Sequence, residues 1–183
     1  MKCIVSASLS IVGALALSAH APAALVGSYV VGSGSSASFV QIEFANANAY
    51  LYEVRYDGAM FGDDLFAIIA QAQPGFFSYV TQSFSFGDAL FGIAIGGDAN
   101  EGFGNPPAYL DYWHYWTREA SELAWTESWT GFGDRAVTNG SWDGWVFNSN
   151  AAPATVPAPG TVVAIALSAA WTGTQRHRGS RRR

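Results

Sequence analysis

The chain has 183 residues, of which half are hydrophobic, 15% are aromatic and only 13% are charged. Soluble domains typically carry about 25% charged residues, so part of this chain is not ordinary soluble surface. All fourteen acidic residues lie between Glu43 and Asp143. The basic residues of this stretch are Arg55, Arg118 and Arg135, which leaves it at −11 (3 − 14). Such an acidic body would repel phosphate backbones, so nucleic acid is not an expected partner.

The N-terminal segment has the layout of a cleavable signal peptide over residues 1–23. Lys2 supplies one positive charge, an uncharged apolar stretch follows, and small residues come last. Two A-x-A cleavage sites, ending at Ala21 or Ala23, fit this order. We prefer Ala23, because cleavage after Ala21 would leave Pro22 at the new N-terminus. An uncleaved membrane anchor is the alternative.

The expected mature protein has no cysteine, because the only one, Cys3, lies in the signal segment. It therefore has no thiol, no disulfide and no cysteine metal ligand. We expect no cofactor and no metal centre. Trimming both ends leaves roughly 125 residues, which can bury one core but not two.

The C-terminal tail has three parts that follow a short Pro/Ala linker at residues 149–155. They are a Pro-rich motif, an apolar run from Thr161 to Trp171, and a terminal arginine cluster. With its uncharged flanks, the apolar run would form a helix of about 27 Å, which is marginal but workable for a hydrocarbon core of roughly 30 Å. The positive-inside rule would keep the arginines cytoplasmic and the domain outside. A disordered basic tail is the alternative.

This three-part order resembles the PEP-CTERM sorting signal over residues 156–183. The motif residues are Val156, Pro157, Ala158, Pro159 and Gly160, and the membrane-stop cluster is Arg176, Arg178, Arg181, Arg182 and Arg183. The resemblance implies processing of the tail by an exosortase-type membrane protease, in addition to cleavage of the N-terminal segment by signal peptidase, with transient anchoring in the inner membrane. It also implies a final place at the cell surface or outside the cell, in association with exopolysaccharide. Ala158 departs from the motif's central glutamate, which bears on how efficiently the tail is processed.

The body begins with residues 25–38, which are rich in glycine and serine and predict a flexible entry. Strands are predicted over residues 38–44 and 49–56, which are rich in β-formers. Asp63 and Asp64 predict the start of a helix, because acids favour the positive end of the helix dipole and one can cap it. The spacing of the apolar residues predicts one buried stripe, made of Leu65, Ile68, Ile69 and Ala72. Paired catalytic carboxylates are the other interpretation of the two aspartates.

Strands are then expected at residues 76–86 and 89–95, followed by a loop from Gly96 to Pro107. Asp98, Asn100 and Glu101 in that loop could hold calcium, but a full calcium-loop motif is absent and a solvated loop is the preferred interpretation. Three further strands are expected, each rich in aromatic residues, at 109–117, 124–130 and, after an Asn139-Gly140 turn, 142–147.

The order of these elements over residues 48–148 loosely resembles the β-grasp-like domain at the C-terminus of transcobalamin. The resemblance is carried by Asp64-Leu65-Phe66 and by residues 91–95, 112–116 and 140–145. It implies an α+β fold with a small, mostly antiparallel sheet and one main helix. The predicted signal helix and the C-terminal hydrophobic helix would flank this domain. No ligand contact is carried over from the family.

Catalysis is not expected, because the body has a single histidine, His114, and no cysteine or lysine. One histidine cannot anchor a metal site, and strand alternation places it on the face opposite Asp111. A glycosidase needs only two carboxylates, and the pairs Glu119–Glu122 and Glu122–Glu127 are the available ones.

We therefore expect a non-catalytic surface or matrix protein. A binding module for carbohydrate or another small ligand is the alternative, because aromatic rings stack on sugar faces. Its candidate residues are Trp113, Tyr115, Trp129 and Trp142. A surface patch of tryptophan would favour binding, and a buried set would favour the structural role.

Overall fold

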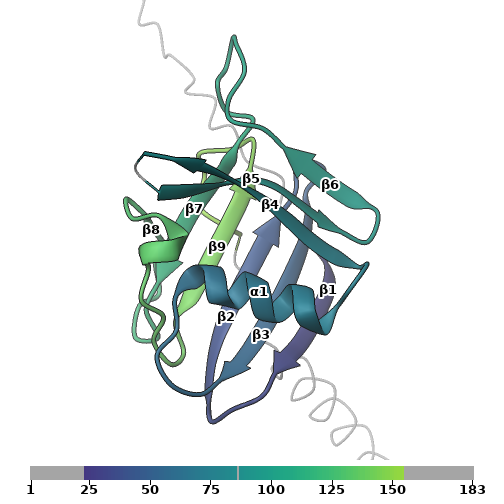
Figure 1. Ribbon diagram of the computed structural model, residues 1–183. Helices are drawn as coiled ribbons and strands as arrows, with labels where there is room; N and C mark the ends of the chain where they lie inside the picture. Colours follow the sequence, from purple (N-terminus) through teal and green to yellow (C-terminus); the bar gives the residue numbers. More distant parts are fainter. Residues whose placement is uncertain (1–22, 86, 155–183) are drawn as a thin grey trace, which may run out of the picture.

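The computed structural model describes residues 23–85 and 87–154 (Figure 1). The sorting motif, the arginine cluster and all of the predicted signal peptide except Ala23 lie outside the described residues. No helix within the described ranges is long and apolar enough to span a membrane.

The described chain folds into two β-sheets and one α-helix, which confirms the α+β class (Figure 1). A six-stranded sheet has the order β1-β3-β2-β9-β7-β8, and a three-stranded sheet has the order β4-β5-β6. Their bounds are β1 (Ala24–Gly32), β2 (Ser36–Glu43), β3 (Asn48–Tyr56), β4 (Phe77–Phe84), β5 (Gly87–Ile95), β6 (Asp98–Glu101), β7 (Trp113–Arg118), β8 (Thr126–Glu127) and β9 (Trp142–Phe147). The helix is α1 (Gly62–Ala72), and a 3₁₀ turn, η1 (Phe132–Asp134), precedes β9.

Five of the seven strand pairings are antiparallel, but the two parallel ones give the larger sheet a mixed character. Strand β1 runs parallel to β3, and β2 runs parallel to β9, a strand about a hundred residues further along. This last pairing places the final strand at the centre of the sheet. Because β7 pairs with the other edge of β9, the aromatic strands lie beside the first hairpin.

The flexible entry predicted for residues 25–38 is wrong, because most of it forms β1 and the start of β2. Its glycines and serines dominate the composition, yet Tyr29 and Val31 point toward the core. The Tyr29 ring stacks on that of Tyr52 with a centroid separation of 5.2 Å. Pairing along the whole of β3 therefore orders a segment whose composition alone favours flexibility.

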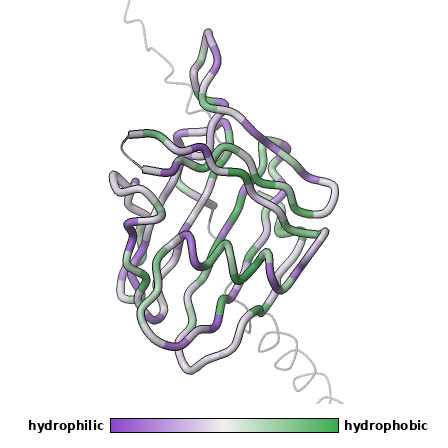
Figure 2. The backbone as a smooth tube through the Cα atoms, in the orientation of Figure 1, coloured by the Kyte–Doolittle hydropathy of each residue, from purple (hydrophilic) through white to green (hydrophobic). Residues whose placement is uncertain are grey.

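Helix α1 lies across one face of the six-stranded sheet, and hydrophobic residues gather between the two (Figure 2). The predicted cap is confirmed for Asp64, whose Oδ2 accepts the backbone N–H of Phe61 at 2.9 Å. The predicted stripe is partly wrong, because Ala72 is exposed and Phe66 is buried in its place. The Phe66 ring packs edge-on against the rings of Phe77 and Trp145.

Three other boundaries differ from the prediction. Part of the expected loop at residues 96–107 is strand β6, which pairs with β5. Strand β7 begins at Trp113 and not at Tyr109, because Tyr109 has a φ of 55°, a left-handed conformation that interrupts a strand. Only residues 126–127 of the expected strand at 124–130 pair with a neighbour.

Residues 149–154, predicted as a linker, lie against the outer face of the six-stranded sheet. The backbone N–H of Ala154 donates to Glu43 Oε1 at 2.6 Å, and Gln41 Nε2 donates to the Ala154 carbonyl at 2.7 Å. Pro153 is buried on Gly144, where an added Cβ would lie 2.5 Å from its Cγ. This segment therefore belongs to the folded domain.

Candidate ligand-binding cleft

A cleft of about 830 Å³ opens between the β4–β5 hairpin, the start of α1 and the segment 128–134. The free end of that hairpin and the β8–η1 region lie on the same side of the molecule, at the left of Figure 1. The cleft therefore lies where the smaller sheet meets the aromatic half of the larger sheet.

The floor of the cleft is built from strands β7 and β9. Tyr115 and Trp145 are cross-strand partners, and their rings stack 4.2 Å apart with an interplanar angle of 9°. Trp113 packs edge-on against Phe147 at 5.2 Å. All four side chains are buried, so the floor is rigid and belongs to the hydrophobic core.

One wall is η1, which Phe132 anchors. The Phe132 side chain is 3% exposed, and its ring packs against those of Phe66 and Trp145 at 5.8 and 5.6 Å. The backbone N–H of Gly62 donates to the Arg135 carbonyl at 3.0 Å, which ties the end of the turn to the start of α1. These contacts hold the cleft rim in place without using the side chains that face solvent.

Trp129 stands at the rim and is 92% exposed. The preceding residue ties its backbone to the sheet, because the Ser128 N–H donates to the Tyr115 carbonyl at 2.9 Å, and a local hydrogen bond from the Ser128 hydroxyl to the Thr130 carbonyl at 3.0 Å spans Trp129. The ring itself makes no aromatic contact within the described part of the chain. An indole on an anchored backbone is a suitable stacking platform.

Three exposed carboxylates line the cleft: Asp63 at the start of α1, Asp88 in β5 and Asp134 in η1. Tyr79 from β4 lies among them. Burial, reinforced by the charges of Asp63 and Asp64, raises the pKa of the Tyr79 phenol, which therefore remains a hydrogen-bond donor at neutral pH. Carboxylate acceptors, a phenol donor and aromatic rings together can bind a hydroxyl-rich ring.

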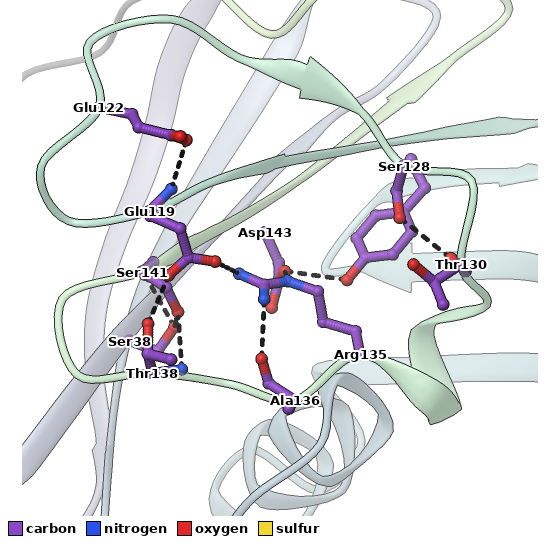
Figure 3. Close-up of polar contacts among 11 residues, drawn as sticks. Ser38, Glu119, Glu122, Ser128, Thr130, Arg135, Ala136, Thr138, Ser141 and Asp143 are labelled. Atoms are coloured by element: carbon purple, nitrogen blue, oxygen red, sulfur yellow. Dashed lines mark hydrogen bonds and ion pairs between the residues drawn. The ribbon is translucent and has the colours of Figure 1, made fainter.

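Behind the floor lies a buried polar network (Figure 3). Asp143 Oδ1 accepts the Tyr115 hydroxyl at 2.9 Å and Arg135 Nε at 3.1 Å, and Arg135 Nη2 pairs with Glu119 Oε1 at 2.9 Å. Burial raises the pKa of Asp143, and the charge of Arg135 and the bond from Tyr115 oppose that rise. The network fixes the orientation of the Tyr115 ring and holds segment 119–141 against the sheet.

Of the four predicted binding residues, Trp113, Tyr115 and Trp129 line this cleft, and Trp142 does not. Trp142 lies on the outer face, between its cross-strand neighbours Phe39 and Arg118. Its ring stacks on Phe39 at 4.5 Å, and the Arg118 guanidinium lies 4.4 Å from its centroid. Trp142 is therefore a packing residue.

Sequence reasoning missed Asp88, Asp134 and Tyr79 as cleft residues. The Gly131-Phe132-Gly133-Asp134 segment carried a usable signal, because glycines beside one aromatic residue indicate a tight turn with a single anchor. Nothing local indicated that the β4–β5 hairpin would face that turn, because the two segments are some fifty residues apart.

Three of the other acidic side chains weighed for chemistry, Glu119, Glu122 and Asp98, have structural partners. Glu119 pairs with Arg135, and Glu122 Oε2 accepts the Glu119 backbone N–H at 3.0 Å. Asp98 Oδ2 accepts the Tyr50 hydroxyl at 2.8 Å, and the hydrogen bonds of Asn46 and Asn48 also reach this carboxylate. The described residues contain no group of three or more His, Cys, Asp or Glu side chains that could hold a metal ion.

Comparison with known proteins supplies no family for this chain. No protein-family model matches it, and no curated protein matches it.

Proposed function

We propose that this chain is an exported, non-catalytic surface protein whose folded domain binds saccharide in the aromatic cleft. The observation that carries the proposal is Trp129, an almost fully exposed indole on a fixed backbone at the rim of a cleft of about 830 Å³. Sugar rings stack on such faces, and carboxylates and phenols bind their hydroxyl groups. Extracellular polysaccharide is the ligand class that fits an exported protein.

A structural role at the cell surface is the second candidate, and the buried tryptophans favour it. Trp113, Trp142 and Trp145 are buried, so half of the six tryptophans in the described residues serve packing. In that case the cleft would bind no sugar and the domain would act by being displayed.

Export and sorting are the other half of the proposal, and their support is sequence alone. Signal peptidase would cut after Ala23, and an exosortase-type protease would process the tail at residues 156–160. The inner membrane would hold the chain transiently before it reaches the cell surface or the medium.

The β-grasp-like description is part of the same proposal. Three features support it: the β2–β3 hairpin, the helix that follows it across the sheet, and the parallel pairing of β2 with the last strand. The three strands β4–β6 would then be an insertion after the helix, and β1 an added edge strand.

The binding proposal is tested with Trp129→Ala and the matched control Leu123→Ala. Leu123 is 95% exposed and does not line the cleft. Affinity electrophoresis in gels containing polysaccharide should show retardation of the wild-type chain and of Leu123→Ala, and none of Trp129→Ala. Equal mobility of all three proteins with and without polysaccharide would refute saccharide binding and leave the structural role as the remaining candidate.

Sorting is tested by intact-mass spectrometry of the protein from cell envelope and from medium. The proposal expects a mass that begins near Ala24 and ends near Pro157. A mass that still includes Arg183 would reduce the tail to an anchor and remove the exosortase step.

A further inference from the structure

We infer that the cleft selects a saccharide carrying free, protonated amino groups over neutral and acidic saccharides, an inference that rests on the proposed function. The ligand class is thus an amino-sugar polymer without N-acetyl groups. Charge, the location of the arginines and the aromatic walls each support it.

The cleft carries acidic groups without basic ones. Asp63, Asp88 and Asp134 line it from three different elements, and no lysine, arginine or histidine is among the described residues that do so. Three carboxylates with no basic side chain beside them make the cleft an anionic surface. An acidic saccharide would meet repulsion from three directions.

The arginines of the described chain are engaged elsewhere. Arg55 pairs with Glu53 at 2.6 Å, and Arg135 pairs with Glu119 and Asp143. The Arg118 guanidinium lies over the rings of Trp125 and Trp142 on the outer face of the sheet. None of the three forms an ion pair with Asp63, Asp88 or Asp134.

The aromatic walls favour the same ligand. Ring faces attract cations as well as stacking on sugars, and indole does so best. Trp129 and Phe103 both line the cleft and are exposed, so the cleft offers an ammonium group on a bound sugar aromatic rings as well as carboxylates. N-acetylation removes the positive charge of the amino group and leaves the sugar ring unchanged.

The expected size of the selection follows from simple electrostatics. One carboxylate about 4 Å from an ammonium group in water corresponds to roughly a fivefold gain in affinity. With more than one carboxylate in reach, amino oligomers should bind about tenfold tighter than their N-acetylated forms at low salt. Because exposed charges are screened beyond about 10 Å at 0.1 M salt, the preference should shrink as salt rises.

The test is isothermal titration of the full chain with three oligomer sets of equal length: glucosamine, N-acetylglucosamine and glucuronic acid. The variants are Asp134→Asn, which removes a cleft charge at constant size, and Glu101→Gln, which removes an exposed charge that does not line the cleft. We expect the order amino, then neutral, then acidic, with the amino preference reduced severalfold in Asp134→Asn and unchanged in Glu101→Gln.

The outcomes separate this inference from the proposed function. Equal binding of amino and N-acetylated oligomers that Trp129→Ala abolishes would overturn the charge selection and leave the saccharide cleft standing. Tighter binding of the acidic oligomers would overturn it as well. Binding of no oligomer would remove the saccharide function itself, and the inference with it.

Discussion

Replacing Asp143 with alanine should destabilise the domain by about 3–5 kcal/mol, the usual cost of removing one partner from a buried ion pair. Asp143 is 1% exposed and receives bonds from the Tyr115 hydroxyl and Arg135 Nε. Hydrogen bonds to charged groups contribute about 1.5–3 kcal/mol each, so two of them give about 3–6 kcal/mol, which agrees with that cost. Domains are stable by only about 5–15 kcal/mol, so this single change could remove much of the margin.

The measurement is urea unfolding followed by tryptophan fluorescence, since the buried ring of Trp145 lies beside Tyr115. If Asp143→Ala does not fold, Asp143→Asn is measured in its place, because it keeps the side-chain volume and one acceptor oxygen and should lose less stability. The control is Glu119→Gln, whose carboxylate is 42% exposed and should contribute about 1 kcal/mol or less. A loss below about 1 kcal/mol for Asp143→Ala would refute the reasoning, because it would mean that the network carries no net stability.

Three further predictions follow from other contacts. Gly144→Ala should cost about 1–3 kcal/mol by overpacking against Pro153 and should raise hydrogen exchange in residues 149–154, whereas Gly97→Ala, where a Cβ meets nothing within 4 Å, should do neither. Phe132→Ala should cost about 3–5 kcal/mol in urea unfolding, because it removes the ring that anchors the cleft wall; a small loss would show that η1 is held by its backbone bonds alone. Burial alone would raise the pKa of Asp98, but hydrogen bonds from Asn48, Tyr50 and Asn46 lower it below its ordinary value. As pH falls, this carboxylate is therefore protonated in the unfolded chain before it is protonated in the folded one. Stability should therefore be lost from the unfolded pKa near 3.9 down to the lower folded value, and Asp98→Asn should flatten that part of the profile of urea midpoint against pH.

The elements that could be predicted from the sequence are those whose signal is local. β-Forming residues placed the strand at residues 49–56, aromatic residues after an Asn-Gly turn placed the strand at residues 142–147, and the acidic pair placed the start of α1 at the correct turn. The parallel pairings of β1 with β3 and of β2 with β9 have no local signal, because each joins segments that other elements separate. The flexible entry was predicted wrongly for this reason, because residues 24–32 form a strand only through their pairing with β3.

The candidate site was predictable only in part, because a cleft is a product of pairing. Alternation correctly placed Trp113 and Tyr115 on one face of β7, and both line the cleft floor. Trp129 and Trp142 look alike in the sequence, yet one is exposed at the rim and the other is buried beneath Arg118. That difference depends on β9 lying between β2 and β7, which no local pattern states.

The aromatic excess that suggested a binding protein has mainly a structural cause. Strand register sets Phe39, Trp142 and Arg118 in one row on the outer face of the sheet. Trp125 packs against Trp142 and Arg118, and Pro153 covers the neighbouring Gly144. The helix and the smaller sheet cover the inner face, so the central strands are buried on both sides. A strand that is buried on both faces carries apolar residues at successive positions, and not only at every second one. In this sheet many of those residues are aromatic. The number of tryptophans therefore says little about ligands. The informative feature is the location of Trp129, which the packing does not use.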